Sequence, residues 1–506
     1  MEKKFSEEFA IGIDLGTGSC KTVVLGKSGE VLGIASANYA AKNISSKWKE
    51  QDPDSLYNGV ISSLVKAVQS ANILPDKCLG LSIGGALHSL IAINHNHQPL
   101  TGVITWADLR SKKQSGLIAS QYRDREYYQR NGCPNNPMYP ISKIMWIREE
   151  TPDIFNEVYK FFSAKEYVIW KLTGNEIVDY AIASGTGLFN IINLEWDDEL
   201  MDTAGINTNY LSKPESPLTE VGFLDSKLAR QAGLCGAIPI YLGSADAVNS
   251  SIGAGTTNSD SLTCMIGTSG AIRTISQKPI LDKKERLWCY AIERQLWLVG
   301  GSINNGGLAL DWLRSLFNNL VPGNKDIGFN QLMDWASEIQ PGSEGLFCLP
   351  FLTNERSPYW NPNMRAVLFG LTLKHDHRHI ARSFLEGISF RLKSVLEAIQ
   401  EVFDIEFSEI KASGGFTVSP IWIQILADVL NQNISIPTND ETSAVGAAYW
   451  VLQANQIVKN LDDMKNLVGV SKIYCPKPEY RSQYDKTYPI YKELYFSSRD
   501  IFDKIQ

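Results

Sequence analysis

The chain lacks an apolar run long enough to span a bilayer, and it lacks any dense tract of lysine and arginine. The first absence argues against a membrane-spanning helix. With 48 basic and 55 acidic side chains the formal net charge is −7, so general binding to nucleic acid is not expected. Residues 1–10 also lack the apolar core of a signal peptide. These absences predict a cytoplasmic protein with neither a nucleic-acid nor a membrane partner.

Closely spaced cysteines are lacking as well. The eight cysteines lie at least 25 residues apart, which excludes a local CxxC redox pair or a zinc ribbon. We expect reduced and mostly buried thiols. Glycine and proline, with 39 and 21 residues, are near average usage, so a collagen-like or low-complexity scaffold is also excluded.

What is present is a pattern that occurs twice in 506 residues, a length that favours two or more domains. An apolar strand that ends in Asp14 is followed by a Gly/Thr/Ser turn and by two further strands, and a helix opens at Asp52-Pro53. Downstream, residues 261–266 form a strand, Gly267–Gly270 a turn and residues 271–275 a returning strand, with another strand over 296–300. Helices are expected near residues 308–316, 380–402 and 422–429.

This duplication predicts two related α/β domains that face each other across a central cleft. Small residues between Ile238 and Gly255 mark the boundary. We expect a first domain over residues 1–245 and a second over residues 246–455. The polar, tyrosine-containing tail over residues 456–506 is expected to be a helical appendage.

The first turn, from Asp14 to Lys21, combines groups that suit a phosphate. Backbone N–H groups of a Gly/Thr/Ser turn can form a nest for phosphate oxygens, and Lys21 adds a positive charge. Asp14 at the strand end can hold a magnesium ion, directly or through water. An ordinary hairpin, whose glycines supply positive φ, explains the same residues equally well. The GxxxxGK[ST] spacing of a P-loop is absent.

Two other segments carry candidate chemistry. The turn Lys411–Thr417 contains Gly414 and Gly415 and leads into a helix, whose N-terminus favours an anion. Asp246 is flanked by small residues, so a substrate can approach its carboxylate and give it a proton. Asp246 also suits the N-cap of the helix that follows, and the two roles are compatible.

In their order along the chain, these turns resemble the FGGY carbohydrate kinases over about residues 9–450. Residues 138–146 resemble the first signature of that family, residues 369–387 the second, and residues 358–365 the segment before it. The resemblance implies the two-domain actin-like ATPase fold, also described as ribonuclease H-like. It implies ATP and Mg²⁺ as cofactors, a small sugar acid or polyol as substrate, and a homodimer as a possible assembly.

The resemblance also implies roles for individual residues. Asp246 is expected to be the catalytic base, and Asp14 and Asp246 are the metal candidates. Contacts to the substrate are expected from His88, Trp106, Asp108, Arg110 and Asp246. The turns and the resemblance together give the expected ATP-binding residues, which are Gly16, Thr17, Gly18, Ser19, Lys21, Gly267, Thr268, Gly307, Gly414, Gly415 and Ser419.

The segments around His88–Ser89, Trp106–Ser111 and Asn354–Trp360 are most similar to gluconate kinases of this family. The predicted reaction is therefore transfer of the ATP γ-phosphoryl group to D-gluconate, which gives 6-phosphogluconate. Xylulose or another ketose or polyol is the alternative substrate, and an actin-like ATPase switch is the alternative of a different class. A gluconate carboxylate needs a cation, for which Arg110 is the first candidate, followed by Lys143 and Arg356.

Overall fold

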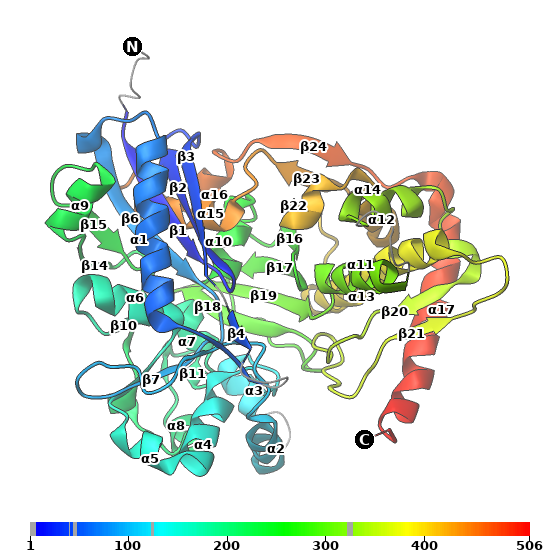
Figure 1. The fold of residues 1–506 in the computed structure, drawn as a ribbon, viewed down its shortest axis with the longest axis horizontal. Coiled ribbons are helices and arrows are strands. Elements are labelled where there is room, and N and C mark those ends of the chain that lie inside the picture. Colours follow the sequence, from blue (N-terminus) through cyan, green and yellow to red (C-terminus); the bar gives the residue numbers. More distant parts are fainter. Residues whose placement is uncertain (1–6, 40, 44–47, 123–125, 321–326, 506) are drawn as a thin grey trace.

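Two β-sheets organise the protein, one in each half of the chain (Figure 1). The structure is a computed structural model that describes residues 7–505 except residues 40, 44–47, 123–125 and 321–326. We call residues 7–245 the first lobe and residues 246–505 the second lobe. The six-stranded sheet of the first lobe has the order β14-β15-β6-β1-β2-β3. Its strands are β1 (Phe9–Leu15), β2 (Ser19–Gly26), β3 (Val31–Asn38), β6 (Cys78–Gly85), β14 (Glu220–Phe223) and β15 (Pro239–Tyr241).

The second lobe contains a seven-stranded sheet of order β18-β19-β17-β16-β22-β23-β24. Its strands are β16 (Ser261–Ile266), β17 (Gly270–Ser276), β18 (Trp288–Glu293), β19 (Leu296–Ile303), β22 (Glu409–Ser413), β23 (Ile434–Pro437) and β24 (Val470–Tyr474). In each sheet three antiparallel strands, β1-β2-β3 or β16-β17-β19, are extended by two parallel ones, β6-β15 or β22-β23. This correspondence confirms the predicted duplication and the two-domain α/β fold.

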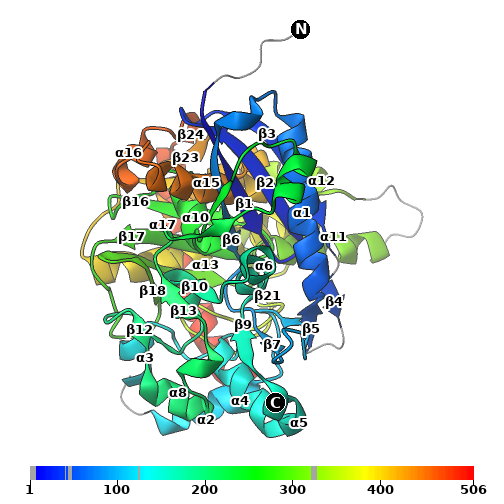
Figure 2. The same cartoon turned by 90° about the vertical axis from the view of Figure 1, so that its left-hand side faces the viewer.

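Helix α1 (Pro53–Ser70) covers one face of the first sheet (Figure 2). It begins where predicted, because the Asp52 side chain caps it by accepting a hydrogen bond of 2.9 Å from the Ser55 N–H. Its buried face packs against alternate side chains of β1, among them Ile11 and Ile13. Period-two alternation therefore turns the intervening residues of β1, Gly12 and Asp14, toward the opposite face of the sheet.

That opposite face is covered by α10 (Asp246–Gly253) and α15 (Thr442–Ala454), which pack against each other. Helix α15 comes from the end of the second lobe, yet it lies on β1 and β6 of the first. A Cβ on Gly12 would lie 1.9 Å from the Ala444 carbonyl oxygen, and one on Gly446 would lie 1.8 Å from the Asn249 carbonyl oxygen. Only glycine allows these backbones to approach so closely.

The described parts of residues 41–51 and 86–215 form short elements below the first sheet in Figures 1 and 2. Three strand pairs join β7 to β9, β10 to β13 and β11 to β12, and β4, β5 and β8 form a small three-stranded sheet. The strands are β4 (Ala41–Asn43), β5 (Lys49–Gln51), β7 (Ile91–Ile93), β8 (Val103–Ile104), β9 (Lys160–Phe162), β10 (Ile177–Asp179), β11 (Phe189–Asn190), β12 (Glu195–Trp196) and β13 (Lys213–Glu215). The helices are α2 (Lys112–Gln121), α3 (Glu126–Asn131), α4 (Pro140–Glu150), α5 (Pro152–Glu157), α6 (Ala164–Thr173), α7 (Tyr180–Ser184) and α8 (Asp198–Ala204), and α9 (Ser226–Ala232) follows β14.

The three predicted helices of the second lobe are present and extend beyond the expected ranges. They are α11 (Gly307–Leu320), α13 (His377–Phe403) and α14 (Pro420–Leu430), with α12 (Phe329–Ser337) in addition. Helix α13 starts earlier than its apolar periodicity indicated, because the Asp376 side chain caps it by accepting from the Arg378 N–H at 3.0 Å. Strands β20 (Phe347–Leu349) and β21 (Val367–Phe369) form a separate antiparallel pair that packs on α13 through β20.

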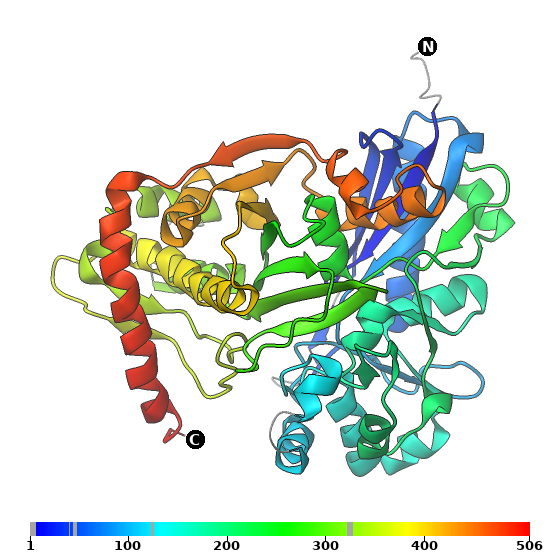
Figure 3. The ribbon, with the colours of Figure 1, turned by 180° about the vertical axis from the view of Figure 1, so that it is seen from behind.

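The tail differs from the predicted helical appendage. Besides α16 (Leu461–Lys465) and α17 (Pro478–Phe502), it contains β24, which pairs with β23 and completes the second sheet at its edge. Figure 3 shows β24 leading along the lobe into α17. Tyr484 on α17 is buried and donates to Glu386 of α13 at 2.9 Å. The tail is therefore an integral part of the second lobe.

The cysteines and the absence of long apolar runs were both noted in the sequence, and the structure describes each. All eight cysteines are free, and five of them are buried, which agrees with reduced and mostly buried thiols. Within the part of the chain that the structure describes, no helix combines the length and the apolarity needed to cross a membrane.

Candidate active site between the two lobes

Three neighbouring strands of the first sheet end side by side. Leu15, at the end of β1, pairs with Gly85, at the end of β6, and Gly85 bridges to Ala245 just after β15. Because these strands are parallel, the residues that follow them meet at one edge of the sheet, the usual position of a ligand site in such sheets. Asp14, the loop that carries His88, and Asp246 therefore lie around the same point.

Asp14 and Asp246 are partly buried carboxylates, and the charge of Asp246 acts on Asp14. The pKa of Asp14 is raised to about 7, first by burial and then by the negative charge of Asp246, against smaller lowering effects from Ser443 and Lys21. Among the described residues, none donates a hydrogen bond to Oδ1 of Asp14, although this oxygen is shielded from solvent. A buried acceptor of this kind needs a donor or a cation, so it marks a place for a ligand.

Asp246 is the first residue of α10, and Ala245 occupies the N-cap position in its place. The Asp246 Oδ1 accepts only from the adjacent Ala247 N–H, at 2.6 Å, so the predicted N-cap role is not realised. Burial raises the pKa of Asp246, and the nearby Arg273 guanidinium lowers it. The carboxylate therefore keeps capacity to accept a proton from a group in the cleft.

Arg273 on β17 is a buried cation that sequence reasoning did not single out. Its Nε donates to the Ser251 hydroxyl at 3.0 Å, and its Nη2 donates to the Ser250 hydroxyl. Both serines belong to α10, so the second sheet holds this charge against the helix that begins with Asp246. The positive charge helps Asp246 to remain ionised.

The first turn connects β1 and β2. Its geometry is a tight loop in which the Gly16 N–H donates to the Ser19 carbonyl at 3.1 Å, and it also contains Thr17 and Gly18. Lys21, on β2 beside this turn, forms an ion pair with Glu441, the residue just before α15. The turn therefore lies against the N-terminus of a helix from the other lobe. Thr17 accepts from the Trp106 indole N–H at 3.3 Å, which connects the turn to the predicted substrate residues.

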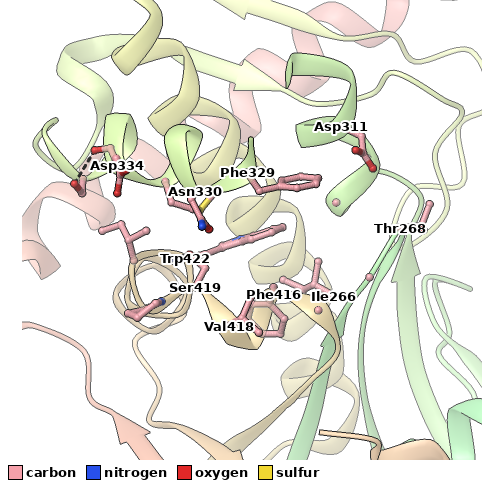
Figure 4. A pocket seen from close by; sticks show the side chains of 17 residues that line it. Ile266, Thr268, Asp311, Phe329, Asn330, Asp334, Phe416, Val418, Ser419 and Trp422 are labelled. Carbon is pink, nitrogen blue, oxygen red and sulfur yellow. Dashed lines mark hydrogen bonds between the residues drawn. The ribbon is translucent and has the colours of Figure 1, made fainter. Parts of the chain in front are cut away.

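The second turn and two later segments surround one cavity of about 550 Å³ (Figure 4). The Gly307 N–H donates to the Gly267 carbonyl at 2.7 Å, and the Leu308 N–H donates to the Thr268 carbonyl at 3.2 Å, so α11 begins on the turn. The structure thereby brings five of the predicted nucleotide residues to the cavity wall, namely Gly267, Thr268, Gly307, Gly415 and Ser419. Gly414 lies directly behind, with a φ of 96° and too little space for a Cβ, which would be 2.7 Å from the Ile266 carbonyl.

Much of this cavity is lined by residues that the sequence analysis missed. Figure 4 shows Phe329, Asn330 and Asp334 of α12 on one side, opposite Ile266, Phe416 and Val418. An apolar slot with a few polar groups suits a flat heterocycle, and the turn at Thr268 suits the phosphates attached to it. Residues of α12 carry no motif, so their only sequence signal is the amphipathic pattern of a helix.

His88 and Trp106 belong to the loops that follow β6 and β8. His88 has a φ of 66°, and its Nδ1 is 2.7 Å from the Gly185 carbonyl oxygen. Burial lowers the pKa of His88 to about 3, so its ring is neutral at physiological pH. The ring packs edge-on against Tyr139 and Tyr290, the latter from the second lobe. His88 is thus a fixed, neutral hydrogen-bonding group at the boundary between the lobes.

Asp108 and Arg110, both predicted to contact the substrate, are paired with each other. Both oxygens of Asp108 accept from Arg110, and Oδ2 also accepts from the Lys49 N–H at 2.7 Å. Arg110 is further paired with Glu50 at 2.7 Å and packs over the rings of Trp48 and Trp146. The guanidinium charge is already balanced by two carboxylates. A substrate carboxylate at Arg110 would compete with Asp108 and Glu50, and the role of Asp108 and Arg110 at the substrate stays a prediction.

Lys143, the second cation predicted for a carboxylate, is also engaged internally. Its ammonium is fully buried and donates to the carbonyls of His88 and Thr105, at 2.5 and 2.9 Å. Burial lowers its pKa to about 7. Lys143 connects the loop of His88 to the loop of Trp106 and so positions both.

Comparison with known proteins identifies the family of the chain. Residues 9–253 match the N-terminal domain of the FGGY family of carbohydrate kinases, and residues 262–454 match the C-terminal domain of that family. Together these matches cover most of the chain, so the protein belongs to the FGGY family of carbohydrate kinases. It is an enzyme of the two-domain actin-like fold that phosphorylates a carbohydrate, which excludes the alternative of a pure ATPase switch.

The chain is 36% identical to a gluconokinase from Bacillus licheniformis over 491 residues, which are 96% of this chain and 95% of that protein. It is 27% identical to a xylulose kinase from Bacillus subtilis strain 168, over 98% of both chains. Among solved structures, a gluconate kinase from Lactobacillus acidophilus superposes with a TM-score of 0.91 at 29% identity, covering 99% of this chain and 100% of that one.

Proposed function

We propose that this carbohydrate kinase transfers the γ-phosphoryl group of ATP to the primary hydroxyl of D-gluconate and so produces 6-phosphogluconate. The observation that carries the reaction is the position of Asp246, a proton-accepting carboxylate that directly follows Ala245 at the meeting point of three strand ends, next to Asp14 and the loop of His88. The choice of gluconate is supported by the greater similarity to a gluconokinase, at 36% identity, than to a xylulose kinase, at 27%.

In this proposal ATP occupies the cavity next to α12, with its phosphates at the turns that contain Gly16–Ser19 and Gly267–Thr268. Backbone N–H groups of these turns and the Lys21 ammonium stabilise the phosphate charge as it moves in the transition state. Because the two turns belong to different lobes, closure of the lobes brings them together and excludes water that would compete as acceptor.

Asp246 accepts the proton of the attacking sugar hydroxyl as the bond to phosphorus forms. Its ionised form is needed for this step, and the Arg273 charge favours that form. His88 and Trp106 bind the sugar and orient it, and orientation of this kind accounts for much of the rate enhancement of phosphoryl transfer.

The carboxylates present also fit a magnesium ion. Asp14 has an orphaned, shielded oxygen, and Asp246 lies close enough to affect its pKa. Among the described residues no group of three or more acidic, histidine or cysteine side chains gathers to hold a metal, which suits an ion that keeps most of its waters. Bound beside Asp14, Mg²⁺ supplies positive charge that offsets the charge of the phosphates.

A coupled assay with ATP and D-gluconate, D-xylulose, D-ribulose or glycerol tests the proposal. We expect the highest kcat/KM with D-gluconate and 6-phosphogluconate as its product. Asp246→Asn is expected to lower kcat by ~10²–10⁴, the contribution of a general base, while ATP still binds. Asp260→Asn, which changes an exposed carboxylate, is the matched control. A higher kcat/KM with xylulose would refute the substrate assignment, and full activity of Asp246→Asn would refute the assignment of the base.

A further inference from the structure

Arg356 differs from the other buried arginines in its partners. Arg110, Arg382 and Arg391 each form an ion pair with a carboxylate, and Arg273 donates to two serine hydroxyls. Arg356 is only 9% exposed, yet no carboxylate among the described residues forms an ion pair with it. Arg356 donates one hydrogen bond, from Nη2 to the Ile303 carbonyl at 3.2 Å. Its Nε has no hydrogen-bond partner among the described residues.

The position of Arg356 is at the boundary between the lobes. It belongs to the segment between β20 and β21 in the second lobe, and its guanidinium carbon lies 5.1 Å from the ring centroid of Trp106 in the first. Its positive charge lowers the pKa of His88, and Tyr139 and Tyr290 act electrostatically on the arginine in turn. Arg356 therefore faces the two residues, His88 and Trp106, that form the sugar side of the site.

A buried guanidinium without an anion is energetically unfavourable, since it has lost water without gaining a counter-charge. Burial lowers the pKa of Arg356 to about 10, which still leaves it charged at neutral pH. The neighbouring His88 is neutral, and the phenols of Tyr139 and Tyr290 are protonated because burial raises their pKa values well above the usual range. The cluster of Arg356, His88, Tyr139 and Tyr290 thus carries one positive charge, and no carboxylate of the described residues pairs with it.

The other two cations near the sugar side are already occupied. Arg110 is neutralised by Asp108 and Glu50, and the Lys143 ammonium donates to two backbone carbonyls. An anionic group on the ligand would therefore find its counter-charge at Arg356. The planar guanidinium also matches a carboxylate geometrically, because two of its N–H groups can donate to the two oxygens at once.

We propose that Arg356 binds the carboxylate of a sugar-acid substrate and thereby selects an aldonate over a neutral ketose or polyol. This inference rests on the proposed function, because it presupposes a sugar acid in the cleft. It assigns specificity to a residue of the second lobe, so that the substrate carboxylate itself connects the two lobes when it binds.

The test compares D-gluconate with D-gluconamide, its neutral counterpart, as substrates of the full-length enzyme. For wild type we expect kcat/KM to be about 100-fold higher with gluconate, the range for a buried charge pair. In Arg356→Leu this ratio should fall to near one, because kcat/KM decreases with gluconate and stays unchanged with gluconamide. Arg356→Lys keeps the charge but not the paired geometry, so an intermediate preference of about tenfold is expected.

Thermal unfolding separates binding from a structural role. Since Arg356→Leu removes an unbalanced buried charge, its Tm without ligand should equal or exceed that of wild type, whereas a structural arginine would lower it. Arg294→Leu, at an exposed position in the β18–β19 turn, is the control. It should change neither the preference for gluconate over gluconamide nor the Tm. An unchanged preference in Arg356→Leu, or equal losses with both substrates, would overturn the role of Arg356. A wild-type enzyme that phosphorylates only neutral sugars would instead overturn the proposed function.

Discussion

Lys21 of the first lobe and Glu441 of the second form an ion pair, with the Lys21 ammonium 2.9 Å from Oε1 and 2.8 Å from Oε2 of Glu441. Both side chains are partly exposed, so solvent screens the pair and either side chain can leave the other for a different partner. In the proposed function Lys21 binds a phosphate of ATP. Glu441 therefore competes with the nucleotide for the same ammonium.

Glu441→Gln should consequently tighten ATP binding about two- to fivefold, the usual strength of an exposed ion pair. Lys21→Gln should weaken ATP binding, because it removes the charge altogether. Isothermal titration calorimetry at low salt measures both effects. Lys27→Gln, which changes another partly exposed lysine in an ion pair, is the control and should leave the affinity unchanged. Weaker binding by Glu441→Gln would contradict the competition.

Asp14→Asn is expected to stabilise the protein in the absence of nucleotide while abolishing kinase activity. The folded-state pKa of Asp14, about 7, lies above its ordinary value of 3.8. The folded protein thus holds this proton more tightly than the unfolded chain, and stability is lost as pH rises from about 4 through 7. The loss is at most about 4 kcal/mol, and less where water reaches the cleft.

Thermal unfolding at pH 4 and pH 8 measures this effect. The Tm of Asp14→Asn should exceed that of wild type at pH 8 and match it at pH 4. Asp76→Asn, at an exposed position, provides the comparison and should show no such difference between the two pH values. A lower Tm for Asp14→Asn at pH 8 would show that the carboxylate is favourably solvated or paired.

Arg273→Gln should move the acidic limb of the kcat/KM profile to higher pH. The Arg273 charge lowers the pKa of Asp246, so its removal leaves the base protonated over a wider range. Arg273→Lys keeps a positive charge and should largely restore the wild-type limb. Arg148→Gln alters a partly exposed arginine of α4 outside this cluster and should have no effect. An unmoved limb in Arg273→Gln would exclude electrostatic support of Asp246.

Phe329→Ala should raise the KM for ATP and leave the KM for the sugar nearly unchanged. Phe329 lines the nucleotide-sized cavity, whereas His88 and Trp106 are not among its lining residues, so the loss of Phe329 should remove apolar contact with ATP alone. We expect the KM for ATP to rise about 5- to 20-fold and the KM for the sugar to stay within about twofold. Steady-state kinetics with each substrate varied in turn tests this. Leu316→Ala on neighbouring α11 is the control, and a parallel rise in the sugar KM would contradict the assignment.

The sequence predicted those parts of the fold that depend on local patterns. The alternation in β1, the Asp52 cap of α1 and the small-residue turns at Gly16 and Gly267 are all readable from neighbouring residues. Strand β24 was missed because its side chains are mostly exposed, so it has neither alternation nor an apolar run. Only its pairing with β23 makes it a strand.

The site was predictable where a turn or a strand end positions it, and not where distant segments meet. Asp246 could be selected because small residues flank it. The pairing of Lys21 with Glu441 joins positions 420 residues apart, and no single-sequence pattern encodes it. The neutralisation of Arg110 by Glu50 is likewise a property of the packed chain. The same holds for Arg356, which has no acidic partner in the described part of the chain.

The position of α15 on the first sheet has a consequence for dividing the gene. A fragment that stops at residue 253 would leave the α15-facing side of β1 and β6 uncovered, and strands exposed in this way are prone to aggregate. Two co-expressed halves, divided after residue 253, should therefore be recovered only as a complex. A circularly permuted chain that begins near residue 442 would instead carry α15 together with the first sheet and so cover that sheet itself.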